Sequence, residues 1–111
     1  MKPGTKLDQG KPKAARFLLS FAKALIEVVK ANDIGADTYS PEGWKQVPEG
    51  KQRYTDALVR HLLLESEEDY DPETGMLHAT AVAWNALARL WFIVQEPKEK
   101  PERKEVTGAS L

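Results

Sequence analysis

The segment "MLHATAVAWNALARLWFIVQ", residues 76–95, decides the fold predicted for this chain. It is apolar on almost every side and contains neither proline nor glycine. Its length is close to the ~20 residues that span a bilayer. It also contains His78, Asn85 and Arg89, however, and these side chains are costly in hydrocarbon. We therefore predict a buried core helix here and not a membrane span.

Two further helices are predicted from apolar residues that recur every three or four positions. The first covers residues 14–32 and the second covers residues 51–66. Residues 33–50, between them, contain three glycines and two prolines, and this composition indicates a long loop. Loops of that length are often functional. Asp71 or Thr74 is expected to cap the helix that follows the acidic segment.

These elements predict an all-α fold, a small helical bundle with three main helices and one long functional loop. Residues 1–13 are expected to form an extended basic arm, residues 14–95 a single helical domain, and residues 96–111 a disordered charged tail. A helix that is apolar nearly all round needs cover on several sides. We therefore expect homo-oligomerisation, as a dimer or a larger assembly, to complete the bundle.

The composition excludes several classes of protein. The chain has 111 residues, no cysteine and a net charge of −1. The lack of cysteine excludes disulfides, thiolate nucleophiles and cysteine-ligated metal sites. A charge so close to zero gives no global attraction to a nucleic acid duplex or a membrane. No signal-peptide pattern opens the chain, so a cytoplasmic location is expected.

Polar residues form a line on the helix predicted for residues 76–95. His78, Asn85 and Arg89 lie within about 20° of one line along the helix, because seven residues complete nearly two turns. One interpretation is a buried hydrogen-bonded stripe or a solvent-facing edge. The other interpretation is that the stripe faces a ligand cavity between helices.

The preceding helix shows a similar stripe. Tyr54, His61, Glu65 and Glu68 follow one another at intervals of seven, four and three residues, which places them on one face if the helix continues that far. A short connection between helices usually makes antiparallel neighbours. We therefore predict that His61 and His78 converge on one cleft, where either can act as a general acid or base.

The acidic segment "EEDYDPETGMLH", residues 67–78, offers carboxylates for a cation. Glu68 and Asp71 are three residues apart, so on a helix they would share a face within reach of one hard divalent ion. Mg²⁺ or Mn²⁺ is the expected cofactor. The alternative is a solvated loop, because a run so rich in acids contains such a pair by chance.

The arm and the long loop contain groups suited to a nucleotide. Lys6 and Lys11 flank Asp8 and a glycine, and lysines act as point charges for phosphate; the alternative is a solvating basic tail. Tyr39 and Trp44 belong to no helix face. They can stack on a base or pin the loop to the core.

Four segments in this order resemble a known family. "TKLDQGKPK", "GADTYSPEGW", "RYTDALVRHL" and "EDYDPETGMLHATAVAWNAL" are similar to a phage and prophage family described as the N-terminal domain of dATP/dGTP diphosphohydrolase. That family is considered related to the all-α nucleoside triphosphate pyrophosphohydrolases of the MazG type. The resemblance covers about residues 4–95. It implies metal-dependent hydrolysis of a purine deoxynucleoside triphosphate to the monophosphate and pyrophosphate.

The resemblance and the stripes together give an expected site. The positions that match the family are Lys6, Asp8, Gly10, Lys11, Pro12, Gly35, Ala36, Tyr39, Trp44, Asp56, Arg60, His61, Glu68, Asp71, Gly75, His78 and Asn85. The expected roles are metal binding by Glu68, Asp71 and Glu27; acid–base chemistry by His61 or His78; and substrate binding by Lys6, Asp8, Lys11, Tyr39, Trp44, Arg60 and Asn85. The alternatives are a nucleotide-binding phage protein without turnover and an oligomeric structural or adaptor protein.

Overall fold

The computed structural model describes residue 4, residues 9–38 and residues 40–102. Within them the chain forms the helices α1 (Ala14–Ser20), α2 (Ala22–Thr38), α3 (Gly50–Glu65) and α4 (His78–Gln95), with a short 3-10 helix η1 (Gly43–Gln46). The prediction of an all-α fold is confirmed. The predictions made for Lys6, Asp8 and Tyr39 lie outside the described residues.

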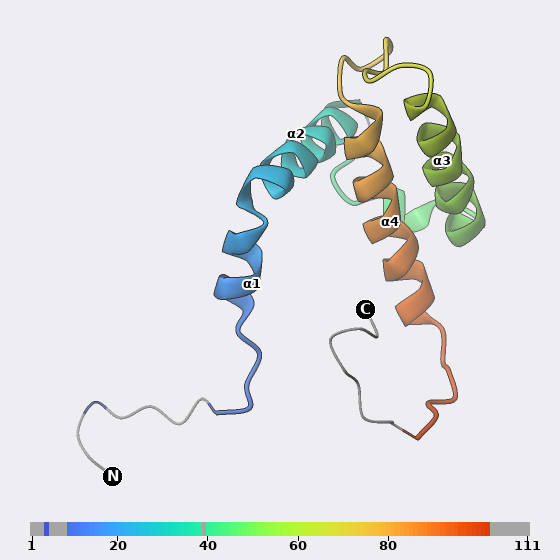
Figure 1. Cartoon of the computed structure of the whole chain (residues 1–111). Coiled ribbons are helices and arrows are strands. Elements are labelled where there is room, and N and C mark those ends of the chain that lie inside the picture. The colour runs from blue at the N-terminus through green and yellow to red at the C-terminus, as the bar shows by residue number, and fades with distance from the viewer. Residues whose placement is uncertain (1–3, 5–8, 39, 103–111) are drawn as a thin grey trace.

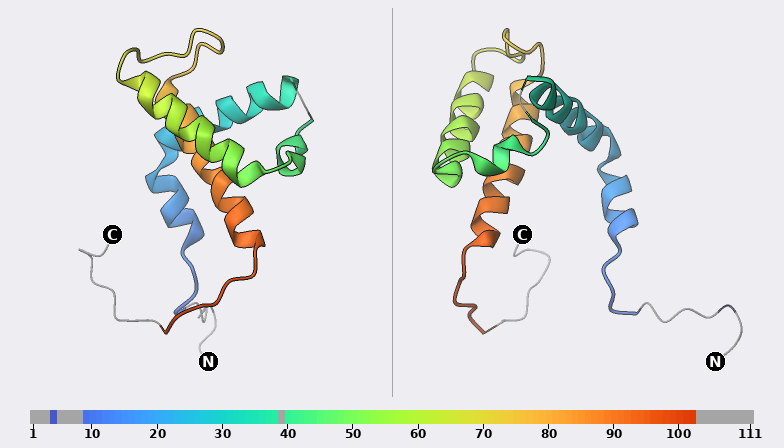
Figure 2. Two further views of the ribbon diagram at one scale, coloured as in Figure 1. Left: turned by 90° about the vertical axis from the view of Figure 1, so that its right-hand side faces the viewer. Right: turned by 180° about the vertical axis from the view of Figure 1, so that it is seen from behind.

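Helices α3 and α4 form an antiparallel hairpin, and α2 crosses α4 near the end where the hairpin turns (Figures 1 and 2). The observed bounds of α3 differ from the predicted range, 51–66, by one residue at each end, and α4 ends at Gln95 as predicted. The described part of the chain contains no helix with the length and hydropathy that crossing a bilayer requires.

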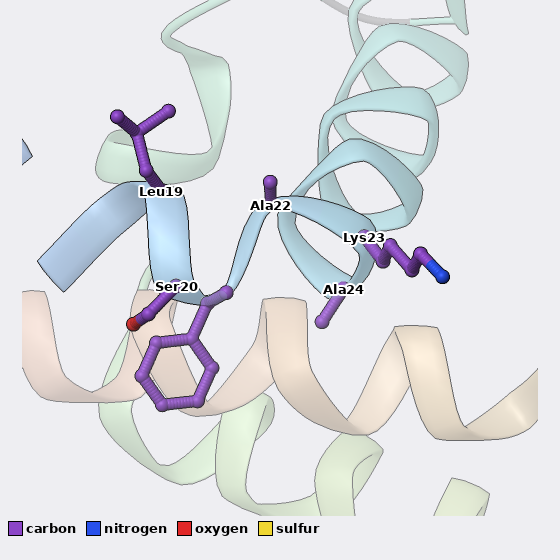
Figure 3. A pocket seen from close by; sticks show the side chains of 6 residues that line it. Leu19, Ser20, Ala22, Lys23 and Ala24 are labelled. Carbon is purple, nitrogen blue, oxygen red and sulfur yellow. The ribbon is translucent and has the colours of Figure 1, made fainter. Parts of the chain in front are cut away.

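The prediction of one helix over residues 14–32 is wrong. The chain bends at Phe21 between α1 and α2. The last turn of α1 is tightened there, since the Phe21 amide donates to the Leu18 carbonyl at 3.2 Å and the Ser20 hydroxyl donates to the Phe17 carbonyl at 2.7 Å. Residues 19–24 line a shallow pocket at this bend (Figure 3). Beyond it, α2 continues to Thr38, six residues past the expected end.

The segment between α2 and α3 is anchored to the hairpin by aromatic residues. Trp44, in η1, packs edge-on against Tyr54, Trp84, Trp91 and Phe92, with ring centroids 5.3–6.4 Å apart. The Tyr54 hydroxyl donates to the Trp44 carbonyl at 3.0 Å. Burial of these rings holds η1 against α3 and α4.

The α3–α4 connection is closed by its own backbone. The amide of Asp71 donates to the Met76 carbonyl, and the amide of Gly75, at φ +73°, donates to the Asp71 carbonyl, both at 2.7 Å. The prediction that Asp71 or Thr74 caps α4 is wrong, since Leu77 precedes the helix and no side chain caps it. The side-chain oxygens of these two residues accept hydrogen bonds within the turn instead: Asp71 Oδ1 from the Glu73 amide and Thr74 Oγ1 from the Met76 amide.

The interior is small and polar. Among the described residues, the side chains that expose less than a tenth of their surface are His78, Thr80, Asn85 and Ala88, all on α4. Many large apolar side chains on all four α-helices remain exposed, among them Leu19 at 73%. The hairpin therefore buries functional groups along α4 and leaves most of its apolar surface uncovered.

Candidate functional site

Two histidines meet where the α3–α4 hairpin turns. His61 lies in the last turns of α3, and His78 is the first residue of α4. Their Nδ1 atoms are 2.9 Å apart. The His78 side chain is 1% exposed, and its backbone amide donates to the Asp69 carbonyl at 2.9 Å, which holds the start of α4 against the acidic segment. The two histidines are therefore side by side, as the antiparallel arrangement predicts.

Asp71 completes a cluster with the two histidines. One ligand atom from each of His61, Asp71 and His78 lies within 4.8 Å of the others. Two imidazole nitrogens and a carboxylate oxygen are a donor set that can hold one divalent cation. Within the described residues this is the group whose geometry suits a metal.

Glu68 lies on the other side of His78. Its Oε1 is 3.1 Å from the His78 Nε2 atom. Since α3 ends at Glu65, the spacing of Glu68 and Asp71 does not place them on one helical face. That part of the sequence reasoning is wrong, because local backbone hydrogen bonds replace the helix after Ser66.

The surroundings of His61 disfavour its protonation. Burial is the main cause that lowers the pKa of His61, and the positive charge of Arg60 lowers it further. Asp71 opposes both effects. Arg60 directly precedes His61 on α3, so its positive charge lies near the histidine cluster.

A cleft of about 850 Å³ opens between α2, η1, α3 and α4. Its lining combines aromatic rings, cations and amides, including Trp44, Tyr54, Trp84, Arg53, Arg60 and Asn85. Apolar walls with a few polar groups are typical of small-molecule sites. His78 and Asn85 are seven residues apart on α4, about 10 Å along one helix face, so the cleft and the histidine cluster share this face.

Asn85 presents a hydrogen-bond acceptor to the cleft. Its Nδ2 atom donates to the Ala81 carbonyl at 2.8 Å, which fixes the orientation of the amide because a carbonyl can only accept. Asn85 lines the cleft, and none of the described buried polar side-chain atoms lacks a partner. The Oδ1 atom is therefore the acceptor of this amide, on a residue that lines the cleft.

Of the residues expected to bind substrate, Trp44, Arg60 and Asn85 line the cleft. Lys11 is exposed on the segment before α1. Of the expected metal ligands, Glu27 pairs with Lys30 at 3.2 Å and is not part of the histidine cluster.

Asn32, Arg53 and Trp84 are among the cleft residues that the sequence did not identify. Asn32 and Trp84 meet there because the indole Nε1 of Trp84 donates to Asn32 Oδ1 at 3.1 Å across α2 and α4. Arg53 joins them from the first turn of α3. Trp84 and Arg53 adjoin recognised stripe residues in the sequence, whereas nothing in the sequence identifies Asn32.

The stripe residue Arg89 serves the hairpin instead of the cleft. Its Nε atom donates to Thr55 Oγ1 at 2.8 Å, between α4 and α3. Part of the predicted polar stripe is thus the hydrogen-bonded structural feature that one of the two interpretations describes.

Comparison with known proteins places the chain in a family. The profile of the family described as "dATP/dGTP diphosphohydrolase, N-terminal" matches residues 1–102. A dATP/dGTP diphosphohydrolase of Salmonella phage PMBT28 is 32% identical over 101 residues, 90% of this chain and 33% of the relative. The chain thus spans about a third of the length of that relative. No solved structure matches this chain. The chain belongs to the dATP/dGTP diphosphohydrolase N-terminal family.

Proposed function

We propose that this chain hydrolyses a purine deoxynucleoside triphosphate to the monophosphate and pyrophosphate with the help of a divalent cation. One observation carries the proposal: an aromatic cleft with two arginines shares a helix face with a cluster of two histidines and an aspartate. The printed name of the phage relative supports the choice of substrate.

The cleft suits the nucleoside and the cluster suits the phosphates. A purine can pack against the rings of Trp44, Tyr54 or Trp84, which line the cleft. The Oδ1 atom of Asn85 can accept a hydrogen bond from the base or from a sugar hydroxyl. The distance of about 10 Å along α4 from Asn85 to His78 is one that a triphosphate chain can bridge.

Charge in the site fits phosphoryl transfer. Arg60 lines the cleft and acts electrostatically on His61, so a phosphate beside it lies near the cluster. A bound divalent cation would polarise a phosphoryl oxygen and lower the pKa of a water molecule. The residues of this chain position the substrate, neutralise its charge and exclude water from the base.

The direct test is product analysis with each deoxynucleoside triphosphate separately, in Mg²⁺ or Mn²⁺. The expected products are the monophosphate and pyrophosphate from dATP or dGTP. Arg60→Gln should raise KM by about 10- to 100-fold, the value of a charge-assisted bond to phosphate. Lys51→Gln is the matched control, because Lys51 is exposed on the same helix and does not line the cleft. Failure to form pyrophosphate from any substrate would contradict the proposal.

A nucleotide-binding domain without turnover is the second candidate. It is favoured by the short span of the chain, which covers about a third of the relative that carries the activity in its name. Tight nucleotide binding without product, unchanged in Asp71→Ala, would support this candidate and exclude the first.

We also propose that the functional unit is a homo-oligomer. The support is the apolar surface on α1 and α3, where Phe17, Leu19 and Leu63 are 62%, 73% and 67% exposed. In a two-fold assembly one such face can cover the same face of a second copy. Light scattering should give at least twice the chain mass, and Leu19→Lys should lower it. A monomer at all concentrations would contradict this proposal.

A further inference from the structure

The cluster at the hairpin turn differs from a site made of carboxylates alone. Its donors are the ring nitrogens of His61 and His78 and one carboxylate oxygen of Asp71, all within 4.8 Å of one another. His78 is 1% exposed, so its donor atom is held in a fixed place and not on a mobile surface chain. Three side chains from α3, the turn and α4 thus present ligand atoms to one point.

The contact with Glu68 fixes the tautomer of His78. A carboxylate oxygen can only accept a hydrogen bond, so the 3.1 Å contact between Glu68 Oε1 and His78 Nε2 places a proton on Nε2. A neutral His78 ring then carries its lone pair on Nδ1, the atom that faces His61. Carboxylates that orient metal-bound histidines in this way are common second partners in metal sites.

The distance between the two Nδ1 atoms fits a shared ion. Two nitrogens about 2.1 Å from one metal, bound at a right angle to each other, are about 3.0 Å apart; the observed distance is 2.9 Å. In the metal-free protein the same contact is a hydrogen bond from His61 Nδ1–H to the His78 lone pair. The free and the bound site can therefore share one distance between the two nitrogens, but the rings must turn on metal binding. An ion shared at a right angle lies off the line along which His61 Nδ1–H points in the hydrogen bond.

We propose that His61 Nδ1, His78 Nδ1 and Asp71 bind one divalent transition-metal ion of the Mn²⁺, Fe²⁺, Co²⁺, Ni²⁺ or Zn²⁺ class in preference to Mg²⁺, with Glu68 as a positioning residue. Magnesium selects oxygen ligands in near-ideal octahedral geometry. Imidazole favours the transition metals, and two histidines with one carboxylate leave coordination positions open. The inference rests on the proposed function in one respect only, namely that phosphate oxygens and water would occupy the open coordination positions of the metal.

This assignment exchanges the roles expected from the sequence. His61 and His78 become ligands, so neither serves as the general acid or base. Glu68 contacts the Nε2 side of the His78 ring, away from Nδ1, and supports a ligand instead of being one. Glu27 has no part in the site, since it pairs with Lys30 on α2.

The test is metal binding by the full chain without nucleotide. Co²⁺ should produce the visible absorption bands of a protein-bound ion, and calorimetry should rank Mn²⁺, Co²⁺ and Zn²⁺ at least 10-fold tighter than Mg²⁺. His61→Asn and Asp71→Asn should each weaken Co²⁺ binding by at least 100-fold. Both residues are only half-buried, so these variants should fold, whereas replacement of the buried His78 risks unfolding.

Two variants in the same acidic segment separate positioning from local charge. Glu68→Gln should weaken Co²⁺ binding by about 10-fold, the usual effect of losing such a partner. Glu67→Gln removes an exposed carboxylate that is outside the cluster and is not among the charges acting on His61, and it should leave binding unchanged. Nitrogen NMR of the metal-free chain should show a proton on Nε2 of His78, and Glu68→Gln should weaken that preference.

The outcomes separate this inference from the proposed function. Co²⁺ binding unaffected by His61→Asn and Asp71→Asn, or Mg²⁺ binding as tight as Mn²⁺ binding, would overturn the inference. Hydrolysis supported by Mg²⁺ alone, in a chain that binds no transition metal, would overturn it while the proposed function stands. Variant-sensitive Co²⁺ binding without hydrolysis of any nucleotide would support the inference and leave the proposed function refuted.

Discussion

Gly50, the first residue of α3, permits the close packing of the aromatic cluster. A Cβ atom at this position would lie 2.5 Å from Phe92 Cε2 and 2.7 Å from Cε1, whereas carbon atoms in contact are separated by about 3.5–4.0 Å. Phe92 cannot retreat freely, because it stacks on Tyr54 at 5.8 Å and packs edge-on against Trp91 at 5.0 Å. Gly50→Ala must therefore displace an aromatic ring by about 1 Å.

Overpacking of a core costs about 1–3 kcal/mol, and the helix propensity of alanine returns up to about 1 kcal/mol. We expect Gly50→Ala to lower the free energy of unfolding by about 1–2 kcal/mol and Tm by roughly 5–15 °C. Gly35 is the matched control, since it lies within α2 and a Cβ atom there meets nothing within 4 Å. Gly35→Ala should raise stability by up to about 1 kcal/mol.

Thermal and urea unfolding, followed by far-ultraviolet circular dichroism, measure both variants. The reasoning predicts changes of opposite sign for the same chemical substitution. It would be refuted if Gly50→Ala were as stable as the wild type or shifted Tm in the same direction as Gly35→Ala. A second measurement is nucleotide affinity, which Gly50→Ala should lower because Tyr54 and Trp44 contact Phe92 and line the cleft.

Burial lowers the pKa of His61 below its ordinary 6.5, so the unfolded chain binds the His61 proton more tightly than the folded chain does. The unfolding free energy of the metal-free protein should therefore fall as pH drops from 6.5 through the folded-state pKa. His61→Gln should flatten that decline, as measured by urea titrations at several pH values. Thr55→Val removes the oxygen that accepts from Arg89 Nε at 2.8 Å; we expect a loss of about 1–2 kcal/mol in urea unfolding, and no loss would refute the bond's contribution. Trp84→Phe removes the donor to Asn32; amide hydrogen exchange should rise in α2 more than in α3, and equal rises would contradict a local tie.

The bounds of α3 and α4 were predictable because residues at or near the ends of these helices mark where each one begins and ends. Gly50 begins α3, Pro97 follows α4, and apolar residues recur with helical periodicity within both helices. The bend at Phe21 was not predictable, since neither glycine nor proline accompanies it. It is marked by the tightened last turn of α1, where the Phe21 amide donates to the Leu18 carbonyl. The extension of α2 to Thr38 passes through Gly35, a residue that helices tolerate at a cost.

The pairing of the histidines was predictable from helix geometry, but the arrangement of the carboxylates was not. His61 and His78 lie on regular helices that meet at one turn, so a period of 3.6 residues places them. Glu68 and Asp71 lie in the turn, outside any regular helix. Their backbone is held by local hydrogen bonds, from the Glu68 amide to the Leu64 carbonyl and from the Asp71 amide to the Met76 carbonyl. The position of Asn32 in the cleft depends on how α2 crosses α4, which is a tertiary contact without a local signal.

The distribution of burial gives the site its physical meaning. Burying a polar group costs free energy unless it finds partners, and a domain of this size has only a few kcal/mol of stability to lose. Yet three of the four most buried positions on α4 hold His78, Thr80 and Asn85, while Leu87, Leu90 and Val94 on the same helix are exposed. If stability of the isolated chain alone decided the sequence, apolar side chains would be expected at the buried positions of α4 and polar side chains at the exposed ones. The arrangement is expected when the inner face of α4 is retained for a ligand.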